Sequence, residues 1–329
     1  MNPFEELELD IVLSDRCCYC GACGAFCKYG YIRYESEKPI ADDCKHCGVC
    51  FDVCPVNYFS VTKAEIEIFG GRRRDNFLGF YREILAGRAT DESIRRKAQD
   101  GGAVTAILTY LIEEGIVESA VVAGRDECWN PKPSVARSRE DLLNSAGSKY
   151  TQCPVLLGLR EVDGDTALVG LPCHIRALRN AQMYGYEQRV KVALGLFCTQ
   201  TFLGDSFIRK LEENGIDAKK VEKFDVKKGK LTVWVDGEVK TIPLKELTGR
   251  NACKFCEDAT AEFADVSFGS VGSEDGWTTM IIRSDTGERI VKEAVNRGYL
   301  EVQKVSEKGV DAIRKFSSRK KKMVTPLFL

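Results

Sequence analysis

The chain has 329 residues, of which 44% are hydrophobic and 29% charged, and 48 Lys plus Arg face 49 Asp plus Glu. This composition is ordinary for a globular protein and lacks the basic excess of a nucleic-acid-binding chain, so we expect no nucleic-acid partner. The unusual numbers are 15 cysteines against two histidines, which exclude sites built on several His ligands and most Ser-His-Asp chemistry.

The start of the chain and its cysteine distribution bear on the cellular compartment. The first residues, MNPFEELELD, lack the basic and then apolar pattern of a signal peptide, and the longest apolar run, 103–112, is too short to span a bilayer. Nine of the 15 cysteines lie from Cys17 to Cys54. Without an export signal, this crowding favours metal ligands in a reducing cytosol over a disulfide scaffold. We therefore expect a cytoplasmic protein.

A cysteine pattern occurs twice in the first 54 residues, as CCYCGACGAFC and CKHCGVCFDVC. Both copies contain C-x2-C-x2-C-x3-C, the ligand pattern of a ferredoxin with two [4Fe-4S] clusters, in which the fourth cysteine reaches the other cluster. Each copy is followed by a β-prone stretch, YIRY or YFSVT, so 1–69 is predicted to be a small α+β domain. One cluster is assigned to Cys17, Cys20, Cys23 and Cys54, and the other to Cys44, Cys47, Cys50 and Cys27.

Neighbouring residues support the cluster interpretation without adding ligands. Gly21, Gly24 and Gly48 suit a close backbone approach to the sulfurs. Cys18 is interpreted as a bystander, because its neighbour already fills the ligand position, and His46 as a surface residue or one beside the ligands. The alternatives are zinc, which usually takes paired C-x-x-C units, or scattered free thiols. Lys28 replaces the proline that would follow the first run, and this departure removes no ligand.

After a polar linker at 70–78, the pattern changes to alternating strands and helices. Strands are predicted at YREILAGRA, IVESAVVAG, TALVG, VKVALGLFC, ADVSFGS and WTTMIIRS, and helices at DESIRRKAQD, AVTAILTYLIEEG and GERIVKEAVNRG. Ser138–Asp141 has the form of a capping box, and Asp236-Gly237 is expected to turn a hairpin. These elements indicate an α/β domain at 79–305. The remainder, 306–329, is predicted to be a loosely packed basic tail.

Six cysteines lie beyond the first module, and four of them lie near predicted strand ends. They are Cys173, Cys198, Cys253 and Cys256. Ligands of α/β folds meet at the ends of the strands, so these thiols are candidates for a third cluster, with a zinc site or buried free cysteines as the alternatives. Cys128 and Cys153 are interpreted as structural.

The sequence contains neither G-x-G-x-x-G after a strand nor a Walker loop, so a Rossmann nucleotide site is unsupported. Small polar segments remain at DGGAVT, GSKYTQCP and FGSVGSEDGWTT. They allow close approach of a phosphate-bearing cofactor, and Gly102 directly precedes a helix whose N-terminus favours anions. Ordinary turns are the alternative interpretation.

Several motifs occur together in a known order: GGAVTAILTYLIEEG, GSKYTQCP, VGLPCHIRALR, GLFC and CKFCEDATAEFADVSFGSVG. From about Arg82 to Lys304 the chain resembles the beta-subunit family of coenzyme F420 hydrogenases and dehydrogenases. With the N-terminal module in front, it resembles the F420-oxidising subunit of the archaeal F420 dehydrogenase, found in methanogenesis. The layout also resembles the input end of F420-dependent sulfite reductase, but no sulfite reductase domain follows.

The resemblance implies an α/β flavin-binding domain, preceded by the ferredoxin-like domain, that holds FAD and a [4Fe-4S] cluster and exchanges hydride with coenzyme F420. It makes Cys173, Cys198, Cys253 and Cys256 ligands of that cluster. His174 would hydrogen-bond near the cluster or flavin, unless it is a surface residue. The residues implied to line the FAD site are Gly101, Gly102, Thr105, Ser148, Lys149 and Tyr150, with Gly269, Ser270 and Gly272 as further candidates.

The implied activity is an F420-dependent oxidoreductase that serves as an electron-input subunit. Deazaflavins transfer hydride and clusters transfer single electrons, so the flavin stands between them and no catalytic side chain is assigned. Partners of the membrane dehydrogenase, formate dehydrogenase or heterodisulfide reductase type are implied, and the first of these would place the chain at the inner face of a membrane. The alternatives are a ferredoxin-dependent flavoprotein reductase of the same fold, a flavin-less relay subunit and a zinc-bearing interaction protein.

The phosphate and carboxylates of F420 call for basic residues. The candidates are Arg72, Arg73 and Arg74, or Arg137 and Arg139, with a solvated surface as the simpler interpretation. Residues 319–322 suit an anionic partner or membrane face, although a solvated tail is again the simpler interpretation.

Overall fold

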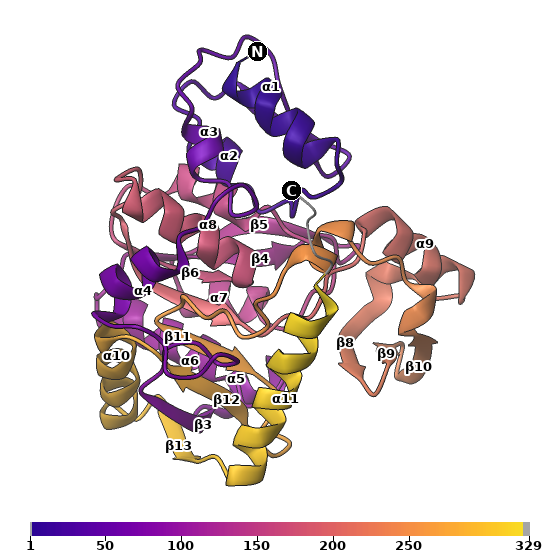
Figure 1. Cartoon of the computed structure of the whole chain (residues 1–329). Helices are drawn as coiled ribbons and strands as arrows, with labels where there is room; N and C mark the ends of the chain where they lie inside the picture. Colours follow the sequence, from indigo (N-terminus) through magenta and orange to yellow (C-terminus); the bar gives the residue numbers. More distant parts are fainter. Residues whose placement is uncertain (1, 325–329) are drawn as a thin grey trace.

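The computed structural model describes residues 2–324. At its N-terminus lies a small α+β module, whose first helices are seen in indigo and violet at the top of Figure 1, while its last helix, α4, lies lower at the left. Its elements are α1 (Pro3–Leu7), η1 (Glu8–Val12), α2 (Ala22–Ala25), β1 (Ile32–Glu35), β2 (Lys38–Ala41), α3 (Val49–Asp52) and α4 (Val61–Phe69). β1 and β2 form an antiparallel hairpin. The strand tendency of YIRY is confirmed by β1. That of YFSVT is wrong, because the Ser60 side chain caps α4 and the chain turns helical there.

The larger part of the chain is built on one eight-stranded mixed sheet with the order β13-β3-β12-β11-β7-β6-β4-β5. Its strands are β3 (Glu83–Ala89), β4 (Ser119–Arg125), β5 (Pro131–Ala136), β6 (Thr166–Gly170), β7 (Val190–Leu196), β11 (Val266–Gly269), β12 (Thr278–Ile282) and β13 (Leu300–Lys304). β4, β6, β7 and β11 are mutually parallel. β3 shares their direction, because β12 is antiparallel to both β3 and β11. The carboxyl ends of these five strands therefore meet at one edge.

Helices cover both faces of this sheet. One core joins α6 (Ala103–Glu113), α7 (Arg139–Ser145) and α10 (Asp285–Asn296) to residues such as Ala120 and Val122 of β4. The other joins α8 (Pro172–Met183) and η2 (Val155–Glu161) to Val121 of the same strand. Successive strand residues thus enter opposite cores. α5 (Glu92–Lys97) follows β3, and the capping box of Ser138 with Asp141 at α7 is confirmed.

A second sheet, with the order β10-β9-β8, stands beside the first with its own core around Phe224 and Leu231 (Figure 1). Its elements are α9 (Gly204–Glu213), η3 (Ala218–Lys220), β8 (Val221–Lys227), β9 (Lys230–Val235), β10 (Glu238–Pro243) and η4 (Leu244–Glu246), with η5 (Asn251–Phe255) after them. The predicted hairpin is confirmed, because Asp236 and Gly237 both have positive φ between β9 and β10.

The C-terminal segment is a packed helix, α11 (Glu307–Met323). Ile313 is fully buried, and the Ser317 hydroxyl donates to the carbonyl of Phe77. The prediction of a loosely packed tail is therefore wrong for 307–323, while 325–329 lie outside the described residues. Within residues 2–324, no helix is long and apolar enough to cross a membrane.

Candidate cluster and flavin sites

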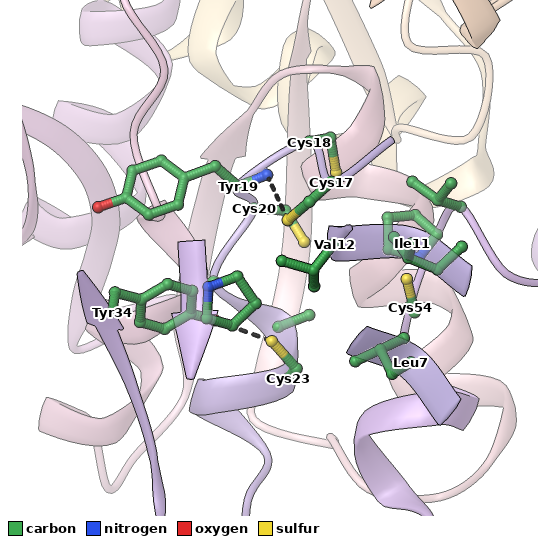
Figure 2. Close-up of a pocket in the computed structure, with 15 residues that line it drawn as sticks. Leu7, Ile11, Val12, Cys17, Cys18, Tyr19, Cys20, Cys23, Tyr34 and Cys54 are labelled. Atoms are coloured by element: carbon green, nitrogen blue, oxygen red, sulfur yellow. Dashed lines mark hydrogen bonds between the residues drawn. The ribbon is translucent and has the colours of Figure 1, made fainter. Parts of the chain in front are cut away.

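The cysteines of the N-terminal module line two cavities. Figure 2 shows the first, in which the sulfurs of Cys17, Cys20, Cys23 and Cys54 surround a space closed by apolar side chains such as Ile11. Cys27, Cys44, Cys47 and Cys50 line the second, together with Tyr31. The structure thus brings together the two predicted groups of four, including the exchange of Cys27 and Cys54 between the repeats. Their role as cluster ligands stays a prediction.

Local backbone features shape the first cavity. Gly21 has φ +90° and starts α2, and a Cβ there would lie 2.6 Å from the carbonyl oxygen of Pro154. Only glycine allows this approach between the module and the main domain. Beyond it, the Tyr34 hydroxyl lies 3.0 Å from Cys23 Sγ and accepts from the Gly24 N–H. The Tyr19 N–H donates to Cys17 Sγ.

Burial controls the protonation of these thiols. It raises the pKa of Cys54 to about 11 and that of Cys50 to about 12, where the neighbouring Cys44 and Cys47 thiols add to the effect. Burial likewise raises the pKa of Cys23. Each of these thiols is therefore protonated at neutral pH in the metal-free chain, and metal loading must displace the protons.

The four cysteines of the main domain also converge. Cys173 follows β6 and Cys198 follows the adjacent parallel strand β7, so their strand ends meet at one edge. Burial raises the pKa of Cys198, and the thiols of Cys253, Cys173 and Cys256 raise it further. Backbone contacts fix the loops, because the Cys198 N–H donates to Ala259 O and the Thr201 N–H to Cys253 Sγ.

None of these groups is arranged for a single ion. In the described part of the chain, no three Cys, His, Asp or Glu side chains are gathered closely enough to chelate one metal ion. The N-terminal thiols instead surround cavities. Ligands spread around a cavity fit a multi-iron cluster better than a tetrahedral zinc ion, whose bonds to sulfur are about 2.3 Å long.

Cys18 occupies a position that its interpretation as a bystander did not anticipate. It lines the first cavity, is half-buried and lies between Cys20 and Cys173. The Cys18 thiol is the main cause of the raised pKa of Cys173. The first cavity and the four main-domain cysteines are therefore neighbours. In contrast, His46 is exposed, and its φ is +57°.

His174 is buried rather than on the surface. Its Nδ1 accepts from the Leu171 N–H at 3.0 Å, and burial lowers its pKa to about 4, so the ring is neutral at physiological pH. The Gln152 amide lies 3.1 Å from His174 Nε2 and 3.6 Å from Cys173 Sγ. His174 and Gln152 thus hold the loop that carries Cys173 in place through these contacts. Cys153 is buried, in keeping with its structural interpretation, and Cys128 is half-buried.

Two of the candidate flavin segments lie side by side. The Ser148 N–H donates to Gln99, next to Gly101 and Gly102, and Gln99 in turn donates to Asp225 of β8. Tyr150 joins the same group, because its hydroxyl accepts from the Val226 N–H. Gly102 starts α6 with φ +78°, and Thr105 lies in the first turn of this helix.

Lys149 and Arg125 place two cations near these segments. Burial and, to a smaller extent, the Arg125 guanidinium lower the pKa of Lys149 to about 8. Lys149 donates to the carbonyls of Ser145 and Ala146, and Arg125 stacks on the Trp129 ring at 3.7 Å. Within residues 2–324, neither cation forms an ion pair with a carboxylate. Two neighbouring cations without a carboxylate fit a phosphate-bearing group.

The remaining flavin candidates lie apart from this group. Gly272 faces α11, where a Cβ would lie 2.7 Å from Ile313, so its lack of a side chain serves helix packing. A Cβ on Gly269 would collide with the Phe197 ring, and Ser270 is exposed. These three positions receive no support for a flavin contact from the structure.

Most of the arginines considered for F420 have structural partners. Arg73 pairs with Glu65 of α4 and, at 2.7 Å, with the buried Glu262. Arg139 pairs with Asp91, and Arg137 donates to Glu161 O. The structure gives Arg72 and Arg74 no ion pair within residues 2–324.

Arg250 fastens the N-terminal module to the main domain. It is buried, pairs with Glu37, donates to Cys17 O at 3.1 Å and faces the Tyr19 ring. Asn180 of α8 adds contacts to Cys54 O and Tyr58 O. Sequence reasoning missed Arg125, Gln152 and Arg250, because isolated polar residues carry no spacing signal. Only the fold brings Gln152 and Arg250 to the cysteine sites and Arg125 to Lys149.

Comparisons with known proteins identify the family of the chain. Two family models for the beta subunit of coenzyme F420 hydrogenase/dehydrogenase match the chain, the N-terminal model at residues 84–160 and the C-terminal model at residues 163–308. The beta subunit of the coenzyme F420 hydrogenase of Methanothermobacter thermautotrophicus is 41% identical over 260 residues, covering 74% of this chain and 92% of that protein.

Two further proteins are similar to this chain. A protein of the F(420)H(2) dehydrogenase of Methanosarcina mazei is 30% identical over 95% of this chain and 91% of its own length. A chain of the F420-reducing [NiFe] hydrogenase complex from Methanosarcina barkeri superposes with a TM-score of 0.72 at 35% identity, covering 76% of this chain and 91% of that one. The chain therefore belongs to the coenzyme F420 hydrogenase/dehydrogenase beta-subunit family.

Proposed function

We propose that this chain is an F420-linked oxidoreductase that exchanges hydride between coenzyme F420 and bound FAD and passes single electrons through three [4Fe-4S] clusters to a partner complex. The family membership supports the link to F420, since its named members belong to F420-dependent hydrogenases and dehydrogenases. The convergence of twelve cysteines into three adjacent groups of four is the observation that carries the relay.

The order of the three groups supports a linear path. Cys173 of the main-domain group contacts the wall of the first N-terminal cavity through Cys18. Cys50 lies in α3, Cys54 lies two residues after the end of this helix, and they line different cavities, so the two cavities are close to each other. Cys47 in the second cavity is exposed. Electrons would leave at this end toward the partner.

FAD would be held by residues around the start of α6. The support is that Ser148 is hydrogen-bonded to Gln99, just before Gly101 and Gly102 at the start of α6, and that the cation Arg125 lies near Lys149. When bound, the flavin supplies the conversion between two-electron and one-electron transfer. The side chains of these segments would bind and orient the flavin. The sheet that contains β8 packs against the segments through the hydrogen bond from Gln99 to Asp225.

The protein's own task is positioning rather than acid–base chemistry. His174 is buried and neutral, and its contacts suit it to supporting the Cys173 loop. Apolar residues such as Val12 and Ile11 close the first cavity and keep water from the sulfurs. A dry, rigid wall of this kind influences a cluster's potential and protects it from hydrolysis.

The proposal is tested by steady-state assays on anaerobically purified, iron-reconstituted protein. Reduced F420 should be oxidised when a viologen dye accepts the electrons. Cys198→Ala should abolish viologen reduction while reduced F420 still bleaches the flavin, because the main-domain cluster that takes electrons from the flavin would be lost. Activity with reduced ferredoxin and none with F420 would support the ferredoxin-dependent reductase instead. Zinc in place of iron would reject the relay.

A further inference from the structure

A buried lysine of the C-terminal helix lies against the main-domain cysteine group. Lys320 is only 6% exposed, although it belongs to the basic run RKKK. Its ammonium group donates to Thr199 O, next to Cys198, and to Cys253 O at 3.0 Å. The backbone on both sides of the cysteine group thus holds this cation in place.

The charge of Lys320 has no carboxylate beside it. Its neighbour Lys321 pairs with Glu262 at 2.7 Å, and Arg176, the other cation near Cys256, pairs with Glu257 at 3.0 Å. In the part of the chain that the structure describes, no carboxylate lies within ion-pairing distance of Lys320. A buried ammonium without a counter-charge is costly, so a negative group is expected nearby.

The nearby groups that can become negative are the four thiols and the buried Asp258, which lies near Cys256. The Lys320 ammonium donates to the carbonyls of Thr199 and Cys253, so its charge lies beside the backbone of the loops that carry Cys198 and Cys253. Four thiolates around a [4Fe-4S] unit carry a net charge of about −2 when oxidised and about −3 when reduced. A fixed cation therefore favours the reduced form.

We propose that Lys320 is the built-in counter-charge of the main-domain cluster and sets its reduction potential above the value that the thiolates alone would give. This inference rests on the cluster assigned to Cys173, Cys198, Cys253 and Cys256 under the proposed function. Lys320 lies beyond residue 308, where the family-model match ends. Lys320 would act on the cluster through the loops that carry its cysteine ligands, so it is a positioning residue. Helix α11 places it there.

The test is a redox titration of the reconstituted holoprotein, followed by electron paramagnetic resonance. Lys320→Met removes the charge and keeps the length, Lys320→Arg keeps the charge, and Lys322→Met removes a charge from an exposed position of the same helix. The signal that disappears in Cys198→Ala identifies the main-domain cluster.

With Lys320→Met, we expect the oxidised-to-reduced ratio of that cluster, measured at the wild-type midpoint, to rise about tenfold, a shift of about −59 mV for one electron. Lys320→Arg should restore most of the wild-type ratio, and Lys322→Met should leave it unchanged. The other two clusters should keep their potentials in every variant.

The possible failures are distinguishable. Wild-type protein with about eight irons, or a Cys198→Ala variant that loses no signal, would reject the third cluster itself. An unchanged potential in Lys320→Met, or equal shifts in Lys320→Met and Lys322→Met, would overturn the role of Lys320 alone. If Lys320→Met folds but loses the cluster, retention in Lys320→Arg supports the counter-charge, whereas loss in both variants contradicts it.

Discussion

At the residue scale, burial changes the pKa of Lys149, one of the candidate flavin-binding residues. Its pKa is lowered to about 8 by burial and by Arg125, while the Cys153 thiol acts in the opposite direction. The charged form is therefore present below pH 8 and is lost above it. In the flavin-free chain the depressed pKa destabilises the fold below pH 8, and this effect disappears as the pH rises from 8 toward 10.5.

This leads to a pH-dependent prediction for flavin binding. If Lys149 contacts an FAD phosphate, affinity should fall as the pH rises through the pKa of Lys149 in the complex, which the phosphate would raise above 8. Lys149→Met should weaken binding about tenfold at pH 7 and remove the step. Flavin fluorescence during titration measures both effects. A step that persists in Lys149→Met would assign it to another group.

Cys18 and Cys54 provide a matched pair for the ligand assignment. Both line the first cavity, but only Cys54 belongs to the four-cysteine pattern. We expect Cys54→Ser to lower the iron content from about twelve to about eight per chain, and Cys18→Ser to leave about twelve. Iron analysis after anaerobic reconstitution checks this. Equal losses in the two variants would make Cys18 a ligand.

At the element scale, the contact between the N-terminal module and the main domain depends on a buried ion pair. Arg250→Met leaves Glu37 half-buried without its partner and the Cys17 carbonyl without a donor. This should lower the free energy of unfolding by about 3 kcal/mol. Lys220→Met, which breaks an exposed pair with Asp236, should cost less than about 1 kcal/mol. Urea titration of the two variants compares them, and similar losses would refute the role of Arg250.

The elements that sequence analysis found and missed differ in their position in the sheets. Buried strands such as β6 and β7 are apolar and were predicted. β5, β8 and β13 were missed, and each is an edge strand. β5 contains Pro131 and Pro133, which an edge tolerates, and β8 reads VEKFDVK, because only one face meets a core.

The residues of the candidate sites also differ in whether the sequence could predict them. Cysteine ligands have fixed spacings within one repeat, so local sequence indicates their grouping. Lys320 stands in a run of four basic residues that is typical of a solvated surface, and only the packing of α11 buries it. The role of Gly272 also depends on the fold, since a glycine that packs against α11 looks the same in sequence as one that contacts a ligand.

At the scale of the whole molecule, the proposed path through the three cysteine groups would end near the exposed Cys47. Removal of the cysteine site that contains Cys47 should distinguish electron transfer within the chain from electron transfer to an external acceptor. In Cys44→Ser, reduced F420 should still bleach the flavin and two clusters, while the rate of viologen reduction falls at least about tenfold. Stopped-flow absorbance in the flavin and iron–sulfur bands and in the band of the reduced viologen measures the two processes. Undiminished dye reduction would place the exit elsewhere.

The most direct test of the relay is an anaerobic titration of the reconstituted protein with reduced coenzyme F420, followed by visible absorbance. One FAD takes two electrons and three clusters take one each, so bleaching of flavin and iron–sulfur bands should end near about 2.5 equivalents of reduced F420 per chain. An end point near one equivalent, with the flavin bleached and the clusters still oxidised, would contradict the relay. Absence of any bleaching in protein that contains FAD and iron would reject F420 as the substrate.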